Sequence, residues 1–173
     1  MELIFSKRFL LTDLPEPLVR ASEHLQFFDN HVTGTRLFLR RIRDPKSREW
    51  TRILVQEYPN ASNDLSQLAR TEIYLTEYEY ETLAVFEGNE LRYNRYFYEF
   101  EGLRWEIDMY LNRELWNLIL AAVNFASEAE MQSFAPPSFA VREITNNEIF
   151  TPARLVDLTI EEIRQKLASS EDI

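Results

Sequence analysis

Arginines that could bind an anion gather in one part of the chain. They are Arg36, Arg40, Arg41, Arg43 and Arg48. The planar guanidinium group matches the geometry of phosphate and carboxylate, so such a cluster predicts a local anion site. A solvated strand face would give the same pattern, and the cluster alone does not choose between the two. The chain has no cysteine and three glycines, which excludes thiolate chemistry and a glycine-rich phosphate loop.

The net charge limits the partners of that cluster. With 29 acidic and 19 basic residues the formal charge is −10, which repels nucleic-acid backbones, so no nucleic-acid partner is expected. Apolar residues make up 45% and aromatic residues 13% of the 173 residues, which favours a folded domain rich in β-structure. The longest apolar run, Leu118 to Val123, is too short to cross a bilayer, and no signal-peptide pattern opens the chain. A cytoplasmic protein without a membrane partner is expected.

The charged residues must be positioned by strands, because they alternate with apolar ones. Arg95 shares one face with residues 97 and 99, whereas the tyrosines at 96 and 98 lie on the other. Beyond Gly102 the alternation resumes: Glu106 and Asp108 share one face, and the residues at 105, 107 and 109 form an apolar face. The short, glycine-containing connection predicts a hairpin. Each strand therefore has one apolar and one charge-bearing face.

The same patterning predicts most of the remaining elements. Further strands are expected over residues 1–11, 20–28, 35–43, 50–58, 66–75 and 119–125, with a break at Asp29-Asn30 and a polar loop at 59–64. A helix over 77–86, ended by Gly88, begins at a capping box of Thr76 and Glu79. A short helix is expected over 127–134, and a second capping box predicts a C-terminal helix over about 159–169.

About eight strands each have one charged face and one apolar face, and the fold must provide a suitable environment for both. A closed barrel with a polar interior, and with helices packed on its apolar outside, provides one. We therefore predict a β-dominated α+β fold, an eight-stranded antiparallel closed tunnel barrel in a single domain spanning residues 1–173. An open sheet with one solvent-exposed face is the alternative.

Four stretches of the chain, in order, resemble the CYTH superfamily, the triphosphate tunnel metalloenzymes. They are SKRFLLTDLP, TRLFLRRIRD, RYNRYFYEF together with WEIDMY, and LILAAVNF. The resemblance runs from the first strand to about Leu158 and implies an eight-stranded antiparallel tunnel with outside helices. It also implies a triphosphate held by tunnel lysines and arginines and a divalent metal held by tunnel carboxylates. Activities in this family include tripolyphosphate, nucleoside triphosphate and thiamine triphosphate hydrolysis, and adenylyl cyclisation.

The chain departs from the family pattern on one face of its strands. Ile4 and Ser6 stand where the first-strand Glu-x-Glu-x-Lys motif has its glutamates, with Arg8 in place of the lysine. In the last tunnel strand, Ala122 and Asn124 replace two further glutamates. Family lysines are likewise missing near Glu57 and at Tyr93, and the family's Arg-x-Arg survives in part as Arg36, Phe38 and Arg40. Arg95, Glu106 and Asp108 are retained.

The resemblance, with these losses, defines our expectation for function. We expect a small anionic or amphipathic ligand in the barrel lumen, bound by Arg8, Arg36, Phe38, Arg40, Tyr93 and Arg95. Ion pairing of the same arginines with Glu57, Glu106 and Asp108 is the equal alternative. Mg²⁺ or Mn²⁺ needs several oxygen ligands, so Asp108 with Glu106 would hold a metal weakly, and no cofactor is required. A salt bridge of Asp108 to Arg95 or Arg8 is the competing role.

Metal-dependent hydrolysis is expected to be lost or weakened, in a natural pseudoenzyme or an engineered variant. An active tripolyphosphatase or nucleoside triphosphatase is the alternative. A filled barrel that serves as a scaffold is a third possibility. The identity of the ligand and the oligomeric state do not follow from the sequence.

Overall fold

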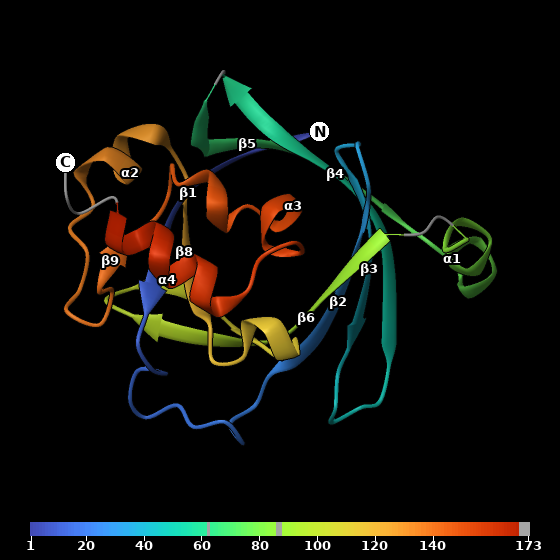
Figure 1. Ribbon diagram of the computed structural model, residues 1–173, viewed down its shortest axis with the longest axis horizontal. Helices are drawn as coiled ribbons and strands as arrows, with labels where there is room; N and C mark the ends of the chain where they lie inside the picture. Colours follow the sequence, from blue (N-terminus) through green and yellow to red (C-terminus); the bar gives the residue numbers. More distant parts are fainter. Residues whose placement is uncertain (62, 86–87, 170–173) are drawn as a thin grey trace.

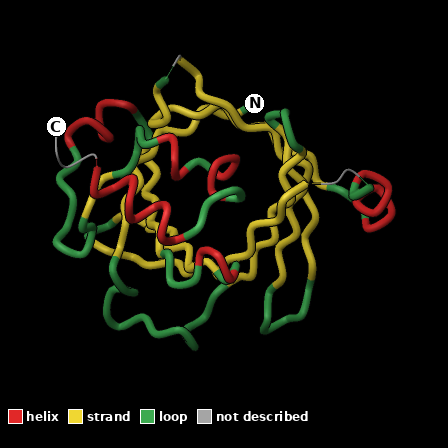
Figure 2. Tube along the Cα trace, in the orientation of Figure 1, coloured by secondary structure: helices red, strands yellow, loops and turns green. Residues whose placement is uncertain are grey.

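The computed structural model describes residues 1–173 except 62, 86–87 and 170–173, and its centre is a closed antiparallel β-barrel (Figures 1 and 2). The strands are β1 (Glu2–Leu11), β2 (Leu25–Val32), β3 (Leu37–Arg43), β4 (Trp50–Ala61), β5 (Asp64–Tyr74), β6 (Gly88–Phe100), β7 (Leu103–Tyr110) and β8 (Ile119–Phe125). The order β5-β4-β3-β2-β6-β7-β8-β1 closes on itself because β1 also pairs with β5. The predicted fold class is confirmed.

The closure between β1 and β5 is partial, and a C-terminal segment completes it. The two strands pair only from Glu2↔Arg70 to Phe5↔Gln67. Farther along β1, the short strand β9 (Arg142–Glu143) pairs instead. Beyond β9, the Ile144 N–H donates to the Arg8 carbonyl on β1 at 2.8 Å, and the Asn146 Oδ1 accepts from the Leu65 N–H on β5 at 2.8 Å. The chain after β8 therefore fills the gap where β1 and β5 separate.

The apolar outer face of β1, β6, β7 and β8 is covered by short segments. Helix α2 (Glu128–Ser133), capped by Ser127, packs there with Phe134 and Phe139. Trp105 is fully buried beneath these two phenylalanines. Burying one such aromatic side chain contributes about 1.5–3 kcal/mol, so this face anchors the barrel wall and leaves the opposite face of each strand to line the interior.

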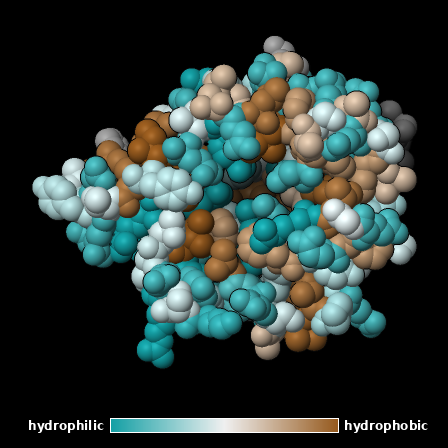
Figure 3. All heavy atoms as spheres, turned by 180° about the vertical axis from the view of Figure 1, so that it is seen from behind, coloured by the Kyte–Doolittle hydropathy of each residue, from teal (hydrophilic) through white to brown (hydrophobic). Residues whose placement is uncertain are grey.

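The C-terminal helices lie across one end of the barrel. They are η2 (Glu148–Phe150), α3 (Pro152–Leu155) and α4 (Ile160–Ser169), and Figure 2 shows them over the opening of the ring. Phe150, Leu155 and Ile163 are at most 1% exposed and pack with Tyr93 and the other large side chains at that end of the tunnel. The opposite face, seen in Figure 3, has hydrophilic and hydrophobic residues around a central hollow. The sequence predicted the helix α4, whereas its position over the end of the barrel is seen only in the structure.

Several predicted boundaries differ from the structure. The break at Asp29-Asn30 is wrong, because β2 continues through both residues, and the strand begins at Leu25 rather than at residue 20. The polar loop at 59–64 is also shorter than expected, since β4 extends to Ala61 and β5 begins at Asp64. Helix α1 (Glu77–Leu83) has the predicted Thr76 capping box but ends earlier, and Phe86 lies outside the described residues. One short 3-10 turn, η1 (Arg113–Leu115), precedes β8.

Helix α1 lies at the side of the barrel after β5 (Figure 1) and contacts the wall through Tyr80, which is 8% exposed and whose ring centroid lies 5.7 Å from the Arg41 guanidinium on β3. No helix in the described part of the chain is long and apolar enough to cross a membrane.

Candidate functional site

The inner wall of the barrel carries the charged face predicted from the strand alternation. Eight of the residues singled out from the sequence line one small cavity inside the barrel: Ile4, Ser6, Arg8, Phe38, Arg40, Tyr93, Arg95 and Ala122. Four acids, Asp29, Glu57, Glu106 and Asp108, and the neutral Asn124 line the same cavity. We call this space the tunnel cavity. Its volume of about 110 Å³ leaves room for only a few water molecules, because side chains fill most of the interior.

Arg40 is held by an acid that the sequence analysis did not identify as a site residue. Its Nε and Nη2 donate to the two carboxylate oxygens of Asp29 at 2.7 and 2.8 Å, and the Tyr93 hydroxyl donates to Asp29 Oδ2 at 2.8 Å. Burial alone would raise the pKa of Asp29, but the charge of Arg40 and these hydrogen bonds outweigh it and lower that pKa. Arg40 and Tyr93 thus belong to one hydrogen-bonded network centred on Asp29.

Arg95 is neutralised in the same way by Glu106 and Asp108. Its Nε and Nη2 donate to Asp108 at 2.7 and 2.8 Å, and its Nη1 lies 2.7 Å from Glu106 Oε2. Burial, assisted by the nearby negative charge of Glu106, raises the pKa of Asp108 despite the attraction of Arg95. The salt bridge between Asp108 and Arg95, one of the alternatives predicted from the sequence, is present. Glu57 is held similarly by Arg70, with Nε to Oε2 at 2.6 Å.

The residues present do not fit a Mg²⁺ or Mn²⁺ site. Glu106 and Asp108 both form ion pairs with Arg95. Ile4, Ser6 and Ala122 bring no carboxylate to the cavity. Among the residues that the structure describes, no group of three or more histidine or acidic side chains is placed to hold a metal ion. A divalent ion at Asp108 would first have to displace a buried guanidinium, so we derive no chemical step through a metal.

Arg8 is the exception to this pairing. Its Nη1 donates to the Phe150 carbonyl at 3.3 Å, while Nε and Nη2 are shielded from solvent and have no hydrogen-bond partner among the described residues. Burial lowers the pKa of this guanidinium, partly offset by Tyr110 and Glu57. Leaving donors of a buried cation unsatisfied costs about 1–3 kcal/mol or more, so the two Arg8 donors indicate a place for an additional acceptor.

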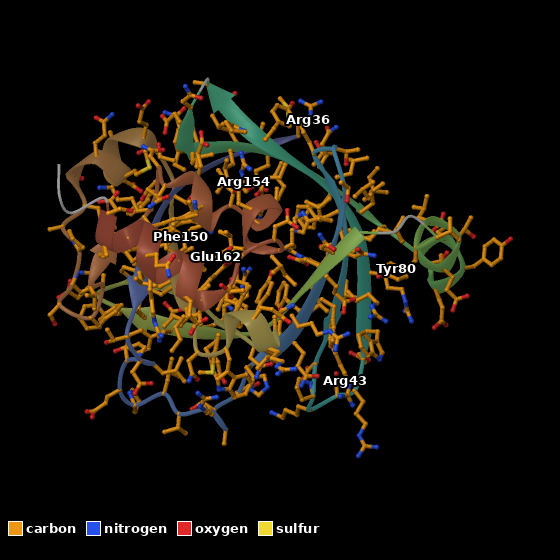
Figure 4. The ribbon with its side chains drawn as sticks, in the orientation of Figure 1. Arg36, Arg43, Tyr80, Phe150, Arg154 and Glu162 are labelled. Carbon is orange, nitrogen blue, oxygen red and sulfur yellow. The ribbon has the colours of Figure 1, made fainter. Side chains whose placement is uncertain are left out.

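Arg8 also lines a second, larger space, where the barrel meets the C-terminal segment. We call this the mouth pocket; its volume is about 350 Å³, and the barrel side is formed by residues at the ends of β2, β3, β4 and β5, with Arg36 in the turn before β3. Thr151, Pro152 and Arg154 form the opposite side. Figure 4 shows Arg36 at the edge of the barrel and Arg154 and Phe150 on the segment across its opening.

The sequence-predicted ligand residues therefore divide between two places. Arg36 and Phe38 line the mouth pocket, Arg8 and Phe38 reach both spaces, and Arg40, Tyr93 and Arg95 lie in the tunnel cavity. Arg36 is exposed, and its guanidinium lies 4.2 Å from the Tyr58 ring centroid. Asn124 is exposed at the far end of β8.

Four charged or titratable residues that line the two spaces, Asp29, His31, Arg70 and Arg154, were among those not predicted from the sequence. Asp29 was assigned to a strand break, although the structure places it within β2 together with His31. Period-two alternation with Phe27 would have placed them on the inner face had the strand been extended. His31 lines the mouth pocket, and burial lowers its pKa, with Asp29 and Glu57 opposing and Arg40 assisting. Arg70 and Arg154 gave no local signal, because their roles depend on strands and segments distant in sequence.

Comparison with solved structures agrees with the tunnel architecture. Two crystal structures of the protein NE1496, described in one as a hypothetical protein and in the other as an inorganic triphosphatase, superpose with TM-scores of 0.60 and 0.59. Each is 21% identical to this chain and matches 90% of it, covering 99% and 95% of its own length. At that identity the likeness establishes a shared fold, in agreement with the closed barrel described above. No protein-family model and no curated protein matches the sequence.

Proposed function

We propose that this chain is a CYTH-like tunnel barrel that binds a small anionic or amphipathic ligand and has lost efficient metal-dependent triphosphate hydrolysis. The observation that carries the proposal is Arg8, a buried guanidinium with two donors that have no partner among the described residues and that borders a cavity of about 350 Å³. A cavity of this size is in the range of ligand pockets, and an oxyanion is the natural acceptor for a guanidinium.

The loss of hydrolysis follows from what the tunnel wall no longer offers. Ile4, Ser6 and Ala122 contribute no carboxylate to the cavity. The four acids that do line it are each held by an arginine: Asp29 by Arg40, Glu57 by Arg70, and Glu106 and Asp108 by Arg95. Phosphoryl transfer depends on a bound metal to neutralise the phosphates and on groups that orient the attacking water. Without a preorganised metal site, the largest electrostatic contribution to that reaction is missing.

A working metal-dependent tripolyphosphatase or nucleoside triphosphatase is the rival, and the likeness to NE1496 favours it. In that case Asp108 and Glu106 would release Arg95 and hold Mg²⁺ or Mn²⁺. The test is phosphate release from tripolyphosphate and from a nucleoside triphosphate with either metal, in the wild type, Asp108→Ala and Glu99→Ala. We expect no turnover above background. Turnover that Asp108→Ala abolishes and Glu99→Ala preserves would overturn the proposal, because Glu99 is an exposed acid outside the tunnel cavity.

Ligand binding is tested by thermal shift and calorimetry with orthophosphate, hexyl phosphate and hexanoate. An anion present at 100 times its Kd should stabilise the fold by about 2.7 kcal/mol, which is roughly 5–10 °C for a chain of this size. Arg8→Gln should abolish the shift, whereas Arg104→Gln, at an exposed position on β7, should preserve it. If none of these anions stabilises the wild type, the barrel is a filled scaffold and the proposal fails.

A further inference from the structure

We infer that the mouth pocket is the binding site and that it takes an amphipathic anion with a single charged head, a phosphomonoester or a carboxylate, in direct contact with Arg154. The inference rests on the proposed function and adds three elements to it: the place of binding, the class of ligand and a specificity residue from the C-terminal segment. It excludes an inorganic polyphosphate as the preferred ligand.

The composition of the mouth pocket favours a ligand with an apolar body. Most of its lining is apolar, and the hydrophobic side chains gather on the β4–β5 side and on α3: Pro59, Leu65, Leu68, Pro152 and Ala153. Burying apolar ligand surface against such a wall contributes about 25 cal/mol per Å². A polyphosphate is hydrophilic along its whole length, so it would lose its hydration against these side chains without hydrogen bonds in return.

The charge in the mouth pocket suits a single head group. Three guanidinium groups line it, those of Arg8, Arg36 and Arg154. Glu57 is already neutralised by Arg70 at 2.6 Å, which leaves the exposed Glu148 as the remaining acid of the lining. The excess of about two positive charges matches a phosphomonoester, which carries about −1.5 to −2 at pH 7, or a carboxylate. This positive charge is confined to the pocket, whereas the chain as a whole has a formal net charge of −10.

Arg154 is positioned by the packing of its neighbours. It lies in the short helix α3 beside Leu155, which is completely buried, and four residues after Phe150, which is 1% exposed. These two side chains fix the segment to the end of the barrel, and the Arg154 side chain itself remains exposed at the mouth pocket. No ion pair joins Arg36 or Arg154 to an acid in the part of the chain that the structure describes. Both are therefore available to an incoming anion.

The experiment compares four probes on the wild-type chain by calorimetry: hexyl phosphate, orthophosphate, tripolyphosphate without metal, and hexanol. We expect hexyl phosphate to bind more tightly than the other three, because only it combines a charged head with an apolar body. The variant Arg154→Gln should weaken hexyl phosphate about 10- to 100-fold, the range for loss of a hydrogen bond to a charged group. Arg164→Gln is the matched control, since Arg164 is a 71% exposed arginine on the neighbouring helix α4.

The outcomes separate this inference from the proposed function. If an anion binds and Arg8→Gln abolishes binding, but Arg154→Gln behaves like Arg164→Gln, the inference is overturned and the proposed function stands. Tighter binding of tripolyphosphate than of hexyl phosphate also overturns it. If no probe binds the wild type, both fail. Because Arg154 and Arg164 are both exposed, neither substitution is expected to prevent folding, and the unfolding temperature of each variant verifies this.

Discussion

Replacing Asp29 by asparagine tests whether the interior of the barrel is a closed network of ion pairs. Asp29 is 3% exposed and Arg40 is 7% exposed, and two hydrogen bonds of 2.7 and 2.8 Å join them. The substitution keeps the shape of the side chain but leaves the Arg40 guanidinium buried without a counter-charge. It also weakens the hydrogen bond that the Tyr93 hydroxyl donates. The perturbation is therefore electrostatic rather than steric.

The expected magnitude follows from burial. Breaking one partner of a buried ion pair costs about 3–5 kcal/mol, because the remaining charge cannot be hydrated. A domain of this kind has a total unfolding free energy of about 5–15 kcal/mol, so the loss should be plain in equilibrium urea denaturation at pH 7. Replacing both partners by apolar residues, Asp29→Leu with Arg40→Met, should recover most of the lost stability.

The control is the exposed ion pair between Glu99 and Arg104, whose side chains are 70% and 63% exposed and 3.8 Å apart. Glu99→Gln should change the unfolding free energy by no more than about 0.5 kcal/mol. If Asp29→Asn costs as little as Glu99→Gln, water reaches Arg40, and the closed tunnel interior described above is refuted.

Two further predictions concern the mouth pocket and its cover. Burial lowers the pKa of His31; the charge of Arg40 lowers it further, whereas the charges of Asp29 and Glu57 raise it, and the net shift is downward. Below about pH 6.5 the unfolded chain therefore binds a proton that the folded chain does not. The unfolding free energy should therefore fall from pH 7.5 to 5.5, and His31→Gln should reduce that slope in urea titrations; an unchanged slope would contradict the assignment. Phe150→Ala should cost about 3–5 kcal/mol, because this 1% exposed ring packs across the end of the tunnel, whereas Val141→Ala, at a 58% exposed position, should have little effect. Equal effects of these two would show that the C-terminal segment is not packed as described.

The success and failure of the sequence-based expectations have physical causes. Alternation in β1, β6 and β7 is a local property, so the inward positions of Arg8, Arg95 and Asp108 could be predicted. The strand β2 was cut short because Asp29 and Asn30 favour turns, a preference that the buried ion pair to Arg40 overrides. The assignment of Arg40 and Arg95 to a ligand site stays a prediction, and both are held by buried acids. Arg8 differs from them because its Nε and Nη2 have no partner among the described residues.

The sequence by itself determined the period-two faces of the strands and the capped helices, because each is set by residues a few positions apart. It also determined that Ile4, Ser6 and Ala122 carry no carboxylate, because residue type alone decides that. Only the tertiary structure decided which charges meet. Arg8 donates its backbone N–H to Thr145, 137 residues away, and borders a pocket whose other side comes from α3. Such partners depend on how the barrel closes and on where the C-terminal segment packs. No local pattern encodes either, because long-range contacts are chosen by the burial of the whole chain.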